Sequence, residues 1–164
     1  MNAASIARTR DVELIRSIMT NRWVYRHITD DGSPDLQSFA PPMDERIIYL
    51  AASDGQGQTL GVFMLHPHNT VCYEVHTCMT PAAWGPFAKE AGAAGCAWMF
   101  ENTDCRRIIT NVPAYNKIAA KFAIDCGMKQ FGINDRSILK NGVLHDQLVY
   151  GLSKGDWLCQ QQCR

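Results

Sequence analysis

The chain has 164 residues, of which 46% are hydrophobic and 20% are charged. This composition is typical of one globular domain with a sizeable core, and it excludes a disordered protein. The 16 basic and 16 acidic side chains cancel, and no dense basic run occurs. A broad electrostatic attachment to nucleic acid or to an anionic membrane is therefore not expected.

Hydropathy and cysteine usage indicate the compartment. No apolar run approaches the roughly 20 residues of a membrane span, and Met1 to Arg10 contains no apolar stretch of the signal-peptide type. The seven cysteines are an odd number without paired C-x-x-C spacing. We therefore expect a reduced, cytoplasmic protein with no membrane attachment.

The first third of the chain predicts a short strand and helical segments, followed by a long loop. Ala4–Ala7 is β-like, Asp11–Met19 has helical periodicity with Thr9 or Asp11 as its cap, and Trp23–Ile28 continues the apolar pattern. Thr29–Glu45 is polar and rich in turn-forming residues. Its five acidic residues fit either a solvated loop or a wall that receives a cationic substrate.

Three consecutive β-like runs follow, and we expect them to form an antiparallel meander. They cover Arg46–Ala52, Thr59–Leu65 and Thr70–Met79, and the loop between the first two has the composition of a hairpin connection. A helix is expected from near Ala82, beginning its regular turns within a residue or two of Pro86. Its apolar residues recur at steps of three or four, at Trp84, Phe87, Ala91, Gly95 and Trp98.

The last third predicts a strand, a helix and two more strands. Arg107–Val112 is the strand, Asn116 is a good N-cap for the helix, and Gly127 suits the left-handed position that ends it. The final strands are Lys129–Asp135 and Leu144–Leu152, with a turn at Lys140-Asn141-Gly142. We expect one domain over residues 1–153 and a polar tail over residues 154–164, from which Trp157 and Leu158 dock.

This order predicts an α/β domain with a mixed sheet. The stretch from Arg106 to Met128, in which a strand is followed by Asn116, a helix and Gly127-Met128, resembles the GNAT superfamily of acyl-coenzyme A N-acyltransferases. It is most similar to the ribosomal-protein alanine acetyltransferase type, with small phage-encoded relatives a further match. The resemblance covers roughly Ser5 to Ser153. It implies a GNAT-like fold: a mixed, mostly antiparallel central sheet flanked by helices, which splays between the strand ending near Met79 and the strand from Arg107.

The resemblance also implies acetyl-coenzyme A as the cosubstrate, yet the sequence departs from the family's pyrophosphate-binding loop. Of that loop's pattern only Gly85 is plainly retained, because Trp84 replaces the basic residue, Phe87 replaces a glycine, and Pro86 has no N–H to donate. Ala88 matches the position of the family's small residue only if the alignment is shifted by one residue. Candidate cofactor-binding residues are nevertheless Cys78, Met79, Thr80, Trp84, Gly85, Phe87, Ala88 and Asn116.

A second departure concerns the acid that many family members use to protonate the leaving thiolate, a tyrosine seven residues after the asparagine. That position is Ala123 here, so Tyr115 or Tyr73 would have to substitute. Proton transfer from the amine is assigned instead to Glu74 and His76, which share one face of a strand. The alternative is a Glu74–arginine pair beside a half-buried His76. The catalytic candidates are thus Glu74, His76 and Tyr115.

Other chemistry at the same strand is less favoured. Cys78 lies on the same face, but nothing in the sequence indicates the lowered pKa that a reactive thiol needs. Glu74, His76, His66 and His68 could ligate a metal ion, but His-x-His is common by chance and no Cys/His block has zinc-finger spacing. We therefore assign no metal site from the sequence.

Two functions remain open. The first is an N-acetyltransferase that moves an acetyl group from acetyl-coenzyme A to a primary amine of a small molecule, peptide or protein. The second is a GNAT-fold protein without this activity, acting as a binding or assembly module of phage origin; the altered loop and the absent tyrosine favour it. A homodimer is left open, and no nucleic-acid partner is expected.

Overall fold

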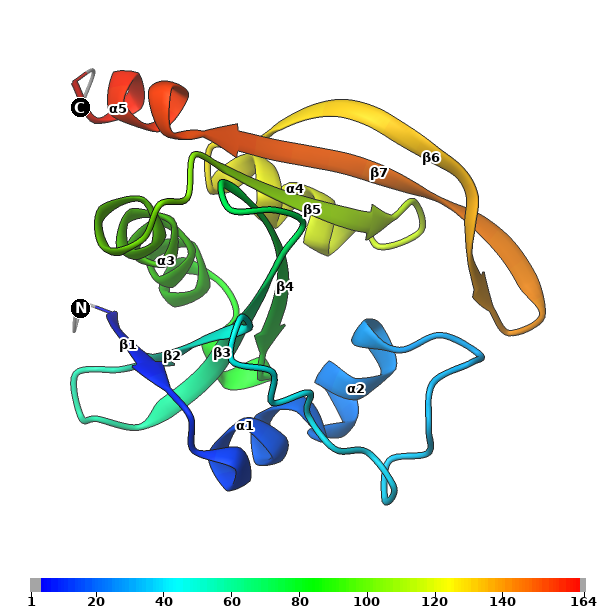
Figure 1. Cartoon of the computed structure of the whole chain (residues 1–164). Coiled ribbons are helices and arrows are strands. Elements are labelled where there is room, and N and C mark those ends of the chain that lie inside the picture. Colours follow the sequence, from blue (N-terminus) through cyan, green and yellow to red (C-terminus); the bar gives the residue numbers. More distant parts are fainter. Residues whose placement is uncertain (1–3, 163–164) are drawn as a thin grey trace.

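A computed structural model describes residues 4–162 of the chain (Figure 1). The elements are β1 (Ser5–Thr9), α1 (Val12–Met19), α2 (Arg22–Ile28), β2 (Ile48–Ser53), β3 (Thr59–Pro67), β4 (Cys72–Met79), the 3-10 turn η1 (Pro81–Ala83), α3 (Pro86–Asn102), β5 (Arg107–Pro113), α4 (Lys117–Asp125), β6 (Lys129–Lys140), β7 (Val143–Ser153) and α5 (Lys154–Gln162).

The seven strands form one mixed sheet in the order β1-β2-β3-β4-β5-β7-β6. Every neighbouring pair is antiparallel except β4 and β5, which are parallel. Those two strands pair only where Cys72–Glu74 lie beside Arg107–Ile109, and beyond this point they diverge, as Figure 1 shows. The expected splay between these strands is confirmed, and we call the opening between them the split.

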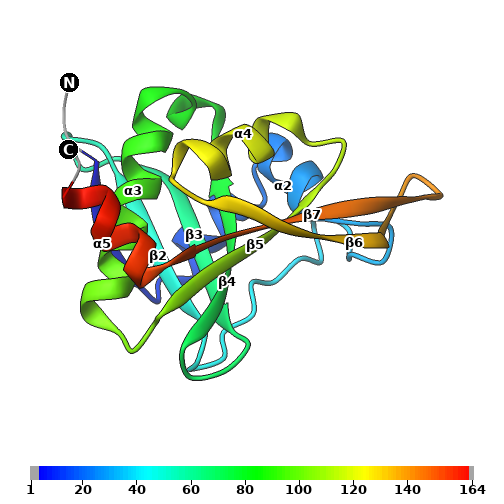
Figure 2. The same ribbon diagram turned by 90° about the horizontal axis from the view of Figure 1, so that it is seen from above.

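Two apolar clusters cover the two faces of the sheet. Alternation of side chains along the strands separates them, so that Leu50 and Phe63 belong to one cluster while Tyr49 and Val62 belong to the other. The larger cluster includes residues of α3, α4 and α5, and the smaller one residues of α1 and α2. In Figure 1, β1, β2 and β3 lie between α3 and α1, and Figure 2 shows α3 and α4 side by side.

Helix α3 begins at Pro86 as predicted, but its buried face differs from the predicted one. Trp84 precedes the helix and is 48% exposed, and Trp98 is only half-buried. The face against the sheet consists mostly of small residues: Ala88, Ala91, Gly92, Gly95, Cys96, Met99 and Phe100. Ala91 and Gly95 of the predicted face are buried as expected. Trp84 and Trp98 are not fully buried, because close approach of the helix backbone to the sheet favours small residues.

The caps of the helices follow the sequence signals. Asp11 caps α1 by accepting from Leu14 N–H at 3.0 Å, and Asn116 caps α4 by accepting from Ala119 N–H at 3.1 Å. Gly127 ends α4 with a φ of 87°, a left-handed conformation that glycine adopts without steric cost.

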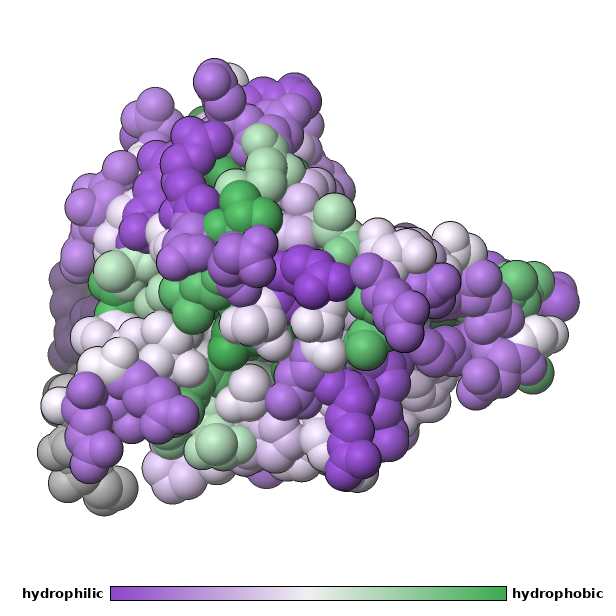
Figure 3. Space-filling model, turned by 90° about the horizontal axis from the view of Figure 1, so that it is seen from below, coloured by the Kyte–Doolittle hydropathy of each residue, from purple (hydrophilic) through white to green (hydrophobic). Residues whose placement is uncertain are grey.

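The β6–β7 hairpin is longer than predicted and forms an arm that projects from the body (Figure 3). Asn141 and Gly142 form its turn with φ values of 53° and 74°, as expected for an Asn-Gly hairpin. Leu139, Val143 and Leu144 are exposed near the tip. Strand β6 extends past Asp135 because its outer half pairs with β7 after a register shift.

The segment expected as a polar tail instead forms α5. Trp157 is buried and lies against Phe100 with ring centroids 5.5 Å apart, whereas Leu158 is 47% exposed. Only one of the two expected contacts is therefore made. Within residues 4–162, no helix is long and apolar enough to cross a membrane. In the same range, six cysteines are free.

Candidate active site

The split exposes backbone groups of β4. His68 N–H donates to the Cys72 carbonyl, and Thr80 N–H donates to the Leu60 carbonyl, so the even-numbered residues of β4 bond to β3. Because backbone groups alternate in direction along a strand, those of Thr77 and Met79 point toward β5. Strand β5 has moved away at this level. A ligand in the split therefore finds these amide groups ready to pair.

Two cavities meet at the split. The first, of about 310 Å³, contains Glu74 and His76 and is called the Glu74 cavity; the second, of about 350 Å³, contains Trp84 and the start of α3 and is called the Trp84 cavity. They share His27, Ile28, Thr77, Asn116, Ala119 and Phe122. The shared lining makes them two ends of one groove.

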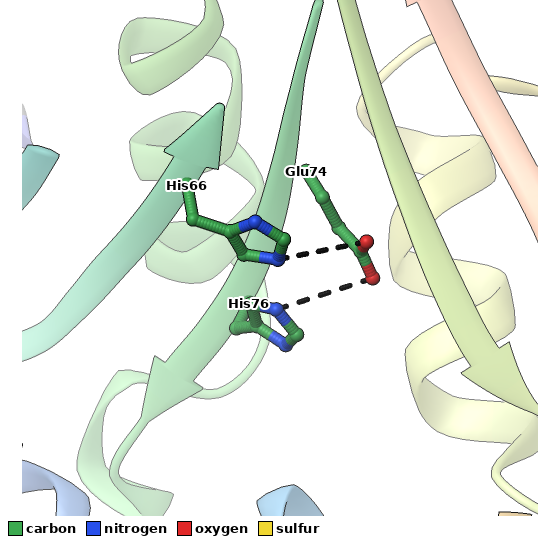
Figure 4. Close-up of side chains that lie close together, drawn as sticks. All are labelled: His66, Glu74 and His76. Carbon is green, nitrogen blue, oxygen red and sulfur yellow. Dashed lines mark ion pairs between the residues drawn. The ribbon is translucent and has the colours of Figure 1, made fainter. Parts of the chain in front are cut away.

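Four polar side chains gather where β3 turns into β4, and we call them the Glu74 cluster: Glu74, His66, His68 and His76. The carboxylate of Glu74 lies 2.9 Å from His68 Nε2, 3.6 Å from His66 Nε2 and 3.9 Å from His76 Nε2. Figure 4 shows the rings of His66 and His76 beside this carboxylate. The ring of His66 stacks between those of His68 and His76, with centroids 5.4 and 5.2 Å away.

A chain of amide side chains holds Glu74 from the opposite side of the split. Asn111 on β5 donates from Nδ2 to Glu74 Oε1 at 2.9 Å, and Asn134 on β6 donates to Asn111 Oδ1 at 2.6 Å. The Glu74 carboxylate is thus anchored on both oxygens, because its Oε2 contacts His68. Glu74 is 9% exposed, and it is the one charged residue among the buried side chains of residues 4–162.

The surroundings of Glu74 and His76 set their charges. Burial is the largest influence on the Glu74 pKa and raises it, but the hydrogen bonds from Asn111 and His68 and the nearby imidazoles together bring the pKa below its usual value. Burial lowers the pKa of His76, outweighing the opposite effect of Glu74. At neutral pH the site therefore holds an ionised carboxylate beside a neutral imidazole, and both can accept a proton.

The other end of the groove has fewer donors. Gly85 precedes α3 with a φ of 96°, and Pro86 occupies the first helical position. The N–H groups of Phe87 and Ala88 have no carbonyl one turn earlier to pair with. Trp84 turns back from this loop, and its indole Nε1 donates to the Met79 carbonyl at 3.2 Å. One acceptor of the split is therefore already occupied.

The structure places the predicted cofactor-binding residues unequally. Five of them line the Trp84 cavity: Met79, Trp84, Gly85, Ala88 and Asn116. Thr80 and Phe87 lie outside both linings, with Thr80 bonded to Leu60 and Phe87 packed against the larger core. Cys78 is fully buried in the smaller core, where burial raises the pKa of its thiol to about 12. A thiol held protonated is no nucleophile.

Tyr115, the third catalytic candidate, lines neither cavity. Its ring stacks edge-on against His145 with centroids 4.8 Å apart, and it is 42% exposed. Partial burial and the nearby carboxylates of Asp30 and Asp31 raise its pKa. The structure thus brings Glu74 and His76 together but not Tyr115, while Ala123 lines the Glu74 cavity as the sequence match places it.

Several site residues were not found from the sequence. Asn111 contacts Glu74 from the neighbouring strand β5, and Asn134 on β6 holds Asn111. Both residues are far from Glu74 in the sequence, so no local spacing signals these contacts. His27 lines both cavities, and its Nδ1 lies 2.6 Å from the Trp23 carbonyl. A carbonyl only accepts, so Nδ1 is the nitrogen that donates in this contact. The only feature of the sequence that could have indicated His27 as a site residue was its position in the last turn of α2.

The acidic loop between α2 and β2 is held largely by its own hydrogen bonds, and it also lines part of the groove. Asp31 accepts from Asn141 and Gly142 N–H, each at 2.7 Å, and so ties the loop to the tip of the β6–β7 arm. Asp35 and Asp44 bond to neighbours within the loop. Asp30 lines the Glu74 cavity. The loop is therefore both a self-bonded surface segment and a wall of the groove.

Comparison of the sequence with protein families gives one match, which covers residues 6–163 and carries the description "Protein of unknown function (DUF2824)". The chain belongs to this family. No curated protein matches the sequence. The family assignment covers nearly the whole chain but assigns no activity.

Solved structures reveal the fold relationship. A spermidine N-acetyltransferase from Vibrio cholerae, in complex with CoA and spermine, matches with a TM-score of 0.79 at 16% identity, over 95% of this chain and 98% of the other. Mutant forms of the spermidine/spermine N-acetyltransferase from the same organism match at 0.78 and 17%, over 97% and 98%. That enzyme in complex with manganese ions matches at 0.74 and 15%, over 96% of each chain. The GNAT-like fold expected from the sequence is confirmed.

Proposed function

We propose that the protein is a GNAT-type N-acetyltransferase that moves an acetyl group from acetyl-coenzyme A to a primary amine of a small molecule. The observation that carries this proposal is the split between β4 and β5, where a groove of two joined cavities passes an anchored carboxylate. Acetyl-coenzyme A occupies the Trp84 cavity, and the amine enters the Glu74 cavity. Support comes from the matching fold of an enzyme solved with CoA and spermine.

The thioester lies where the cavities meet, beside Thr77 and Asn116. The free N–H groups at the start of α3 face the pyrophosphate, because a helix N-terminus favours anions. The backbone N–H and carbonyl of Thr77 and the N–H of Met79 pair with the pantetheine arm. In this arrangement the predicted contributions of Cys78 and Thr80 are limited to shaping the strand.

Glu74 and His76 supply the base. A cationic amine is drawn by Glu74 and by Asp30, both of which line the cavity. It loses a proton through water to the carboxylate–imidazole pair and attacks the thioester carbonyl. The new C–N bond forms, the C–S bond breaks, and the coenzyme leaves as a thiolate. The attacking nitrogen loses its second proton to solvent as the amide forms, and the thiolate takes up a proton from solvent.

A second candidate function is a binding or assembly module that has lost acetyl transfer, as the altered loop and the absent tyrosine suggested. The start of α3 favours it: Pro86 offers no donor, and the Trp84 indole already occupies the Met79 carbonyl. Both features weaken a site for the coenzyme without affecting the fold.

Thermal unfolding with acetyl-coenzyme A tests the proposal. Binding to the native state at 100 times Kd stabilises by about 2.7 kcal/mol. Lys89→Glu places an acidic group in the Trp84 cavity and should abolish the shift, whereas Arg10→Glu makes the same charge change at an exposed site outside both cavities and should preserve it. No shift with the parent protein would contradict the proposal and favour the binding module.

A further inference from the structure

Three members of the Glu74 cluster point their donor atoms at one place. His66 and Glu74 are direct partners in the antiparallel pairing of β3 and β4, and His76 follows Glu74 by two residues on the same face. One donor atom from each of the three residues lies within 4.8 Å of the other two. Figure 4 shows the two imidazoles and the carboxylate around this place. Two adjacent strands thus present two nitrogens and a carboxylate oxygen together.

We propose that His66, Glu74 and His76 bind a divalent transition-metal ion of the zinc type. Imidazole nitrogen and carboxylate oxygen are ligands that Zn²⁺ accepts, and three protein ligands with an open fourth position are a known arrangement for it. Calcium and magnesium take oxygen ligands instead, so the two imidazoles select against them. The fourth position takes water, because His66 and His76 are 34% and 38% exposed.

The distances suit one ion after a small adjustment. Two donors that each lie about 2.1 Å from an ion are at most about 4.2 Å apart. Glu74 Oε2 lies 3.6 Å from His66 Nε2, and Glu74 Oε1 lies 3.9 Å from His76 Nε2, so each of these two pairs is within this limit. One donor atom from each of the three residues lies within 4.8 Å of the other two, so no pair has to close by more than about 0.6 Å. The partial exposure of the two imidazoles leaves both rings room to turn inward without moving the backbone.

Neighbouring side chains hydrogen-bond to the Glu74 carboxylate, as is common for carboxylates that bind a metal ion. His68 contacts Oε2 at 2.9 Å, and Asn111 donates to Oε1 at 2.9 Å. Hydrogen bonds of this kind orient a residue that binds a metal ion, and their loss typically lowers metal affinity by 10- to 100-fold. The charge balance is also favourable, because one carboxylate offsets part of the ion's charge while the imidazoles bind neutral.

This inference stands apart from the proposed acetyl transfer. It needs no coenzyme, and the ion can be measured on the protein alone. Glu74 is common to both, so a bound ion would occupy the carboxylate that receives the proton of the amine.

Metal titration of the full chain tests the inference. The protein is freed of metal with a chelator and titrated with Co²⁺, whose visible absorption reports a four-coordinate site, and Zn²⁺ is then added to displace it. We expect saturation at one ion per chain. His66→Ala and His76→Ala should each weaken Zn²⁺ binding by at least about 100-fold, and His68→Ala by about 10- to 100-fold.

Controls separate this site from surface binding. His145→Ala removes an imidazole elsewhere, and Cys159→Ser removes an exposed thiol. Both should leave the titration unchanged. Each variant is first shown to unfold cooperatively without metal, and glutamine replaces alanine at any position that fails. Unchanged Zn²⁺ affinity in folded His66 and His76 variants, or no saturating ion in the parent, would overturn the inference.

Discussion

The two ends of the groove differ in how completely their polar groups are fixed. At the Glu74 end, a buried carboxylate is held by a histidine from the β3–β4 turn and by an asparagine from β5, itself held by β6. At the Trp84 end, the helix start has a proline in its first position and no side-chain cap. Proton chemistry demands a fixed group, whereas a coenzyme spread over many contacts tolerates the loss of one. Under the proposed function, the Glu74 end would therefore supply the proton chemistry and the Trp84 end would bind the coenzyme.

The largest effect is expected from removing the base at the Glu74 end. Glu74→Gln keeps the shape of the side chain but cannot accept the amine proton, so we expect kcat to fall by about 10²- to 10⁴-fold. Release of coenzyme thiol with a primary amine measures the effect. Tyr115→Phe is the control, because Tyr115 lies outside both cavities. Full turnover by the glutamine variant, with none by Tyr115→Phe, would show that the proton route is wrong.

Weakening the support of the base should have a smaller effect. Asn111→Ala removes the hydrogen bond to Glu74 Oε1, and bonds to charged groups contribute about 1.5–3 kcal/mol. We expect kcat to fall by about 10- to 100-fold with little change in KM, because the amine still binds. Asn134→Ala, one bond further away, should cost less. An equal fall in kcat in both variants, or a rise in KM with unchanged kcat, would contradict a positioning role.

Coenzyme binding at the Trp84 end should be strengthened by one substitution. Pro86→Gly adds a backbone N–H to the first turn of α3, where a phosphate would accept it. We expect up to about tenfold tighter coenzyme A binding in isothermal titration, since the helix destabilisation caused by glycine offsets part of the gain. Pro81→Gly makes the same change in η1, outside the Trp84 cavity, and should have no effect. Weaker binding by Pro86→Gly would contradict the argument.

The smallest expected effect concerns the wall of the Glu74 end. Hydrogen bonds from Gly142 and Asn141 lower the pKa of Asp31, so folding favours its ionised form. This stabilisation is therefore present above the unfolded pKa, about 3.9, and is lost as pH falls through the folded value. We expect Asp31→Asn to lower Tm slightly at pH 7, and the difference from the parent to vanish in acid. A difference that persists in acid would assign the effect to geometry instead of charge.

The sequence predicted the order of elements because its signals are local. Asn116, Gly127 and the Asn-Gly turn each specify backbone geometry over a few residues, and all three are found as expected. The polar character of residues 154–164 concealed α5, because its stability comes from Trp157 packing on Phe100, far away in the chain. Tertiary contact overrode local composition there.

The same distinction explains the site. Glu74 and His76 were identified because their spacing of two on a strand is visible in the sequence. Asn111 lies 37 residues from Glu74, and Asn134 lies 23 residues further, so only the sheet order reveals them. The sequence also grouped His66 with Glu74 as a possible metal ligand, but only the pairing of β3 with β4 places the two residues directly opposite each other.

The most direct test of the account is transfer itself. The full chain is incubated with acetyl-coenzyme A and a panel of primary amines that includes spermine, and both thiol release and the mass of the amine are followed. The account predicts amine-dependent thiol release with an equal amount of acetylated amine. An unchanged amine and no thiol release across the panel would contradict it.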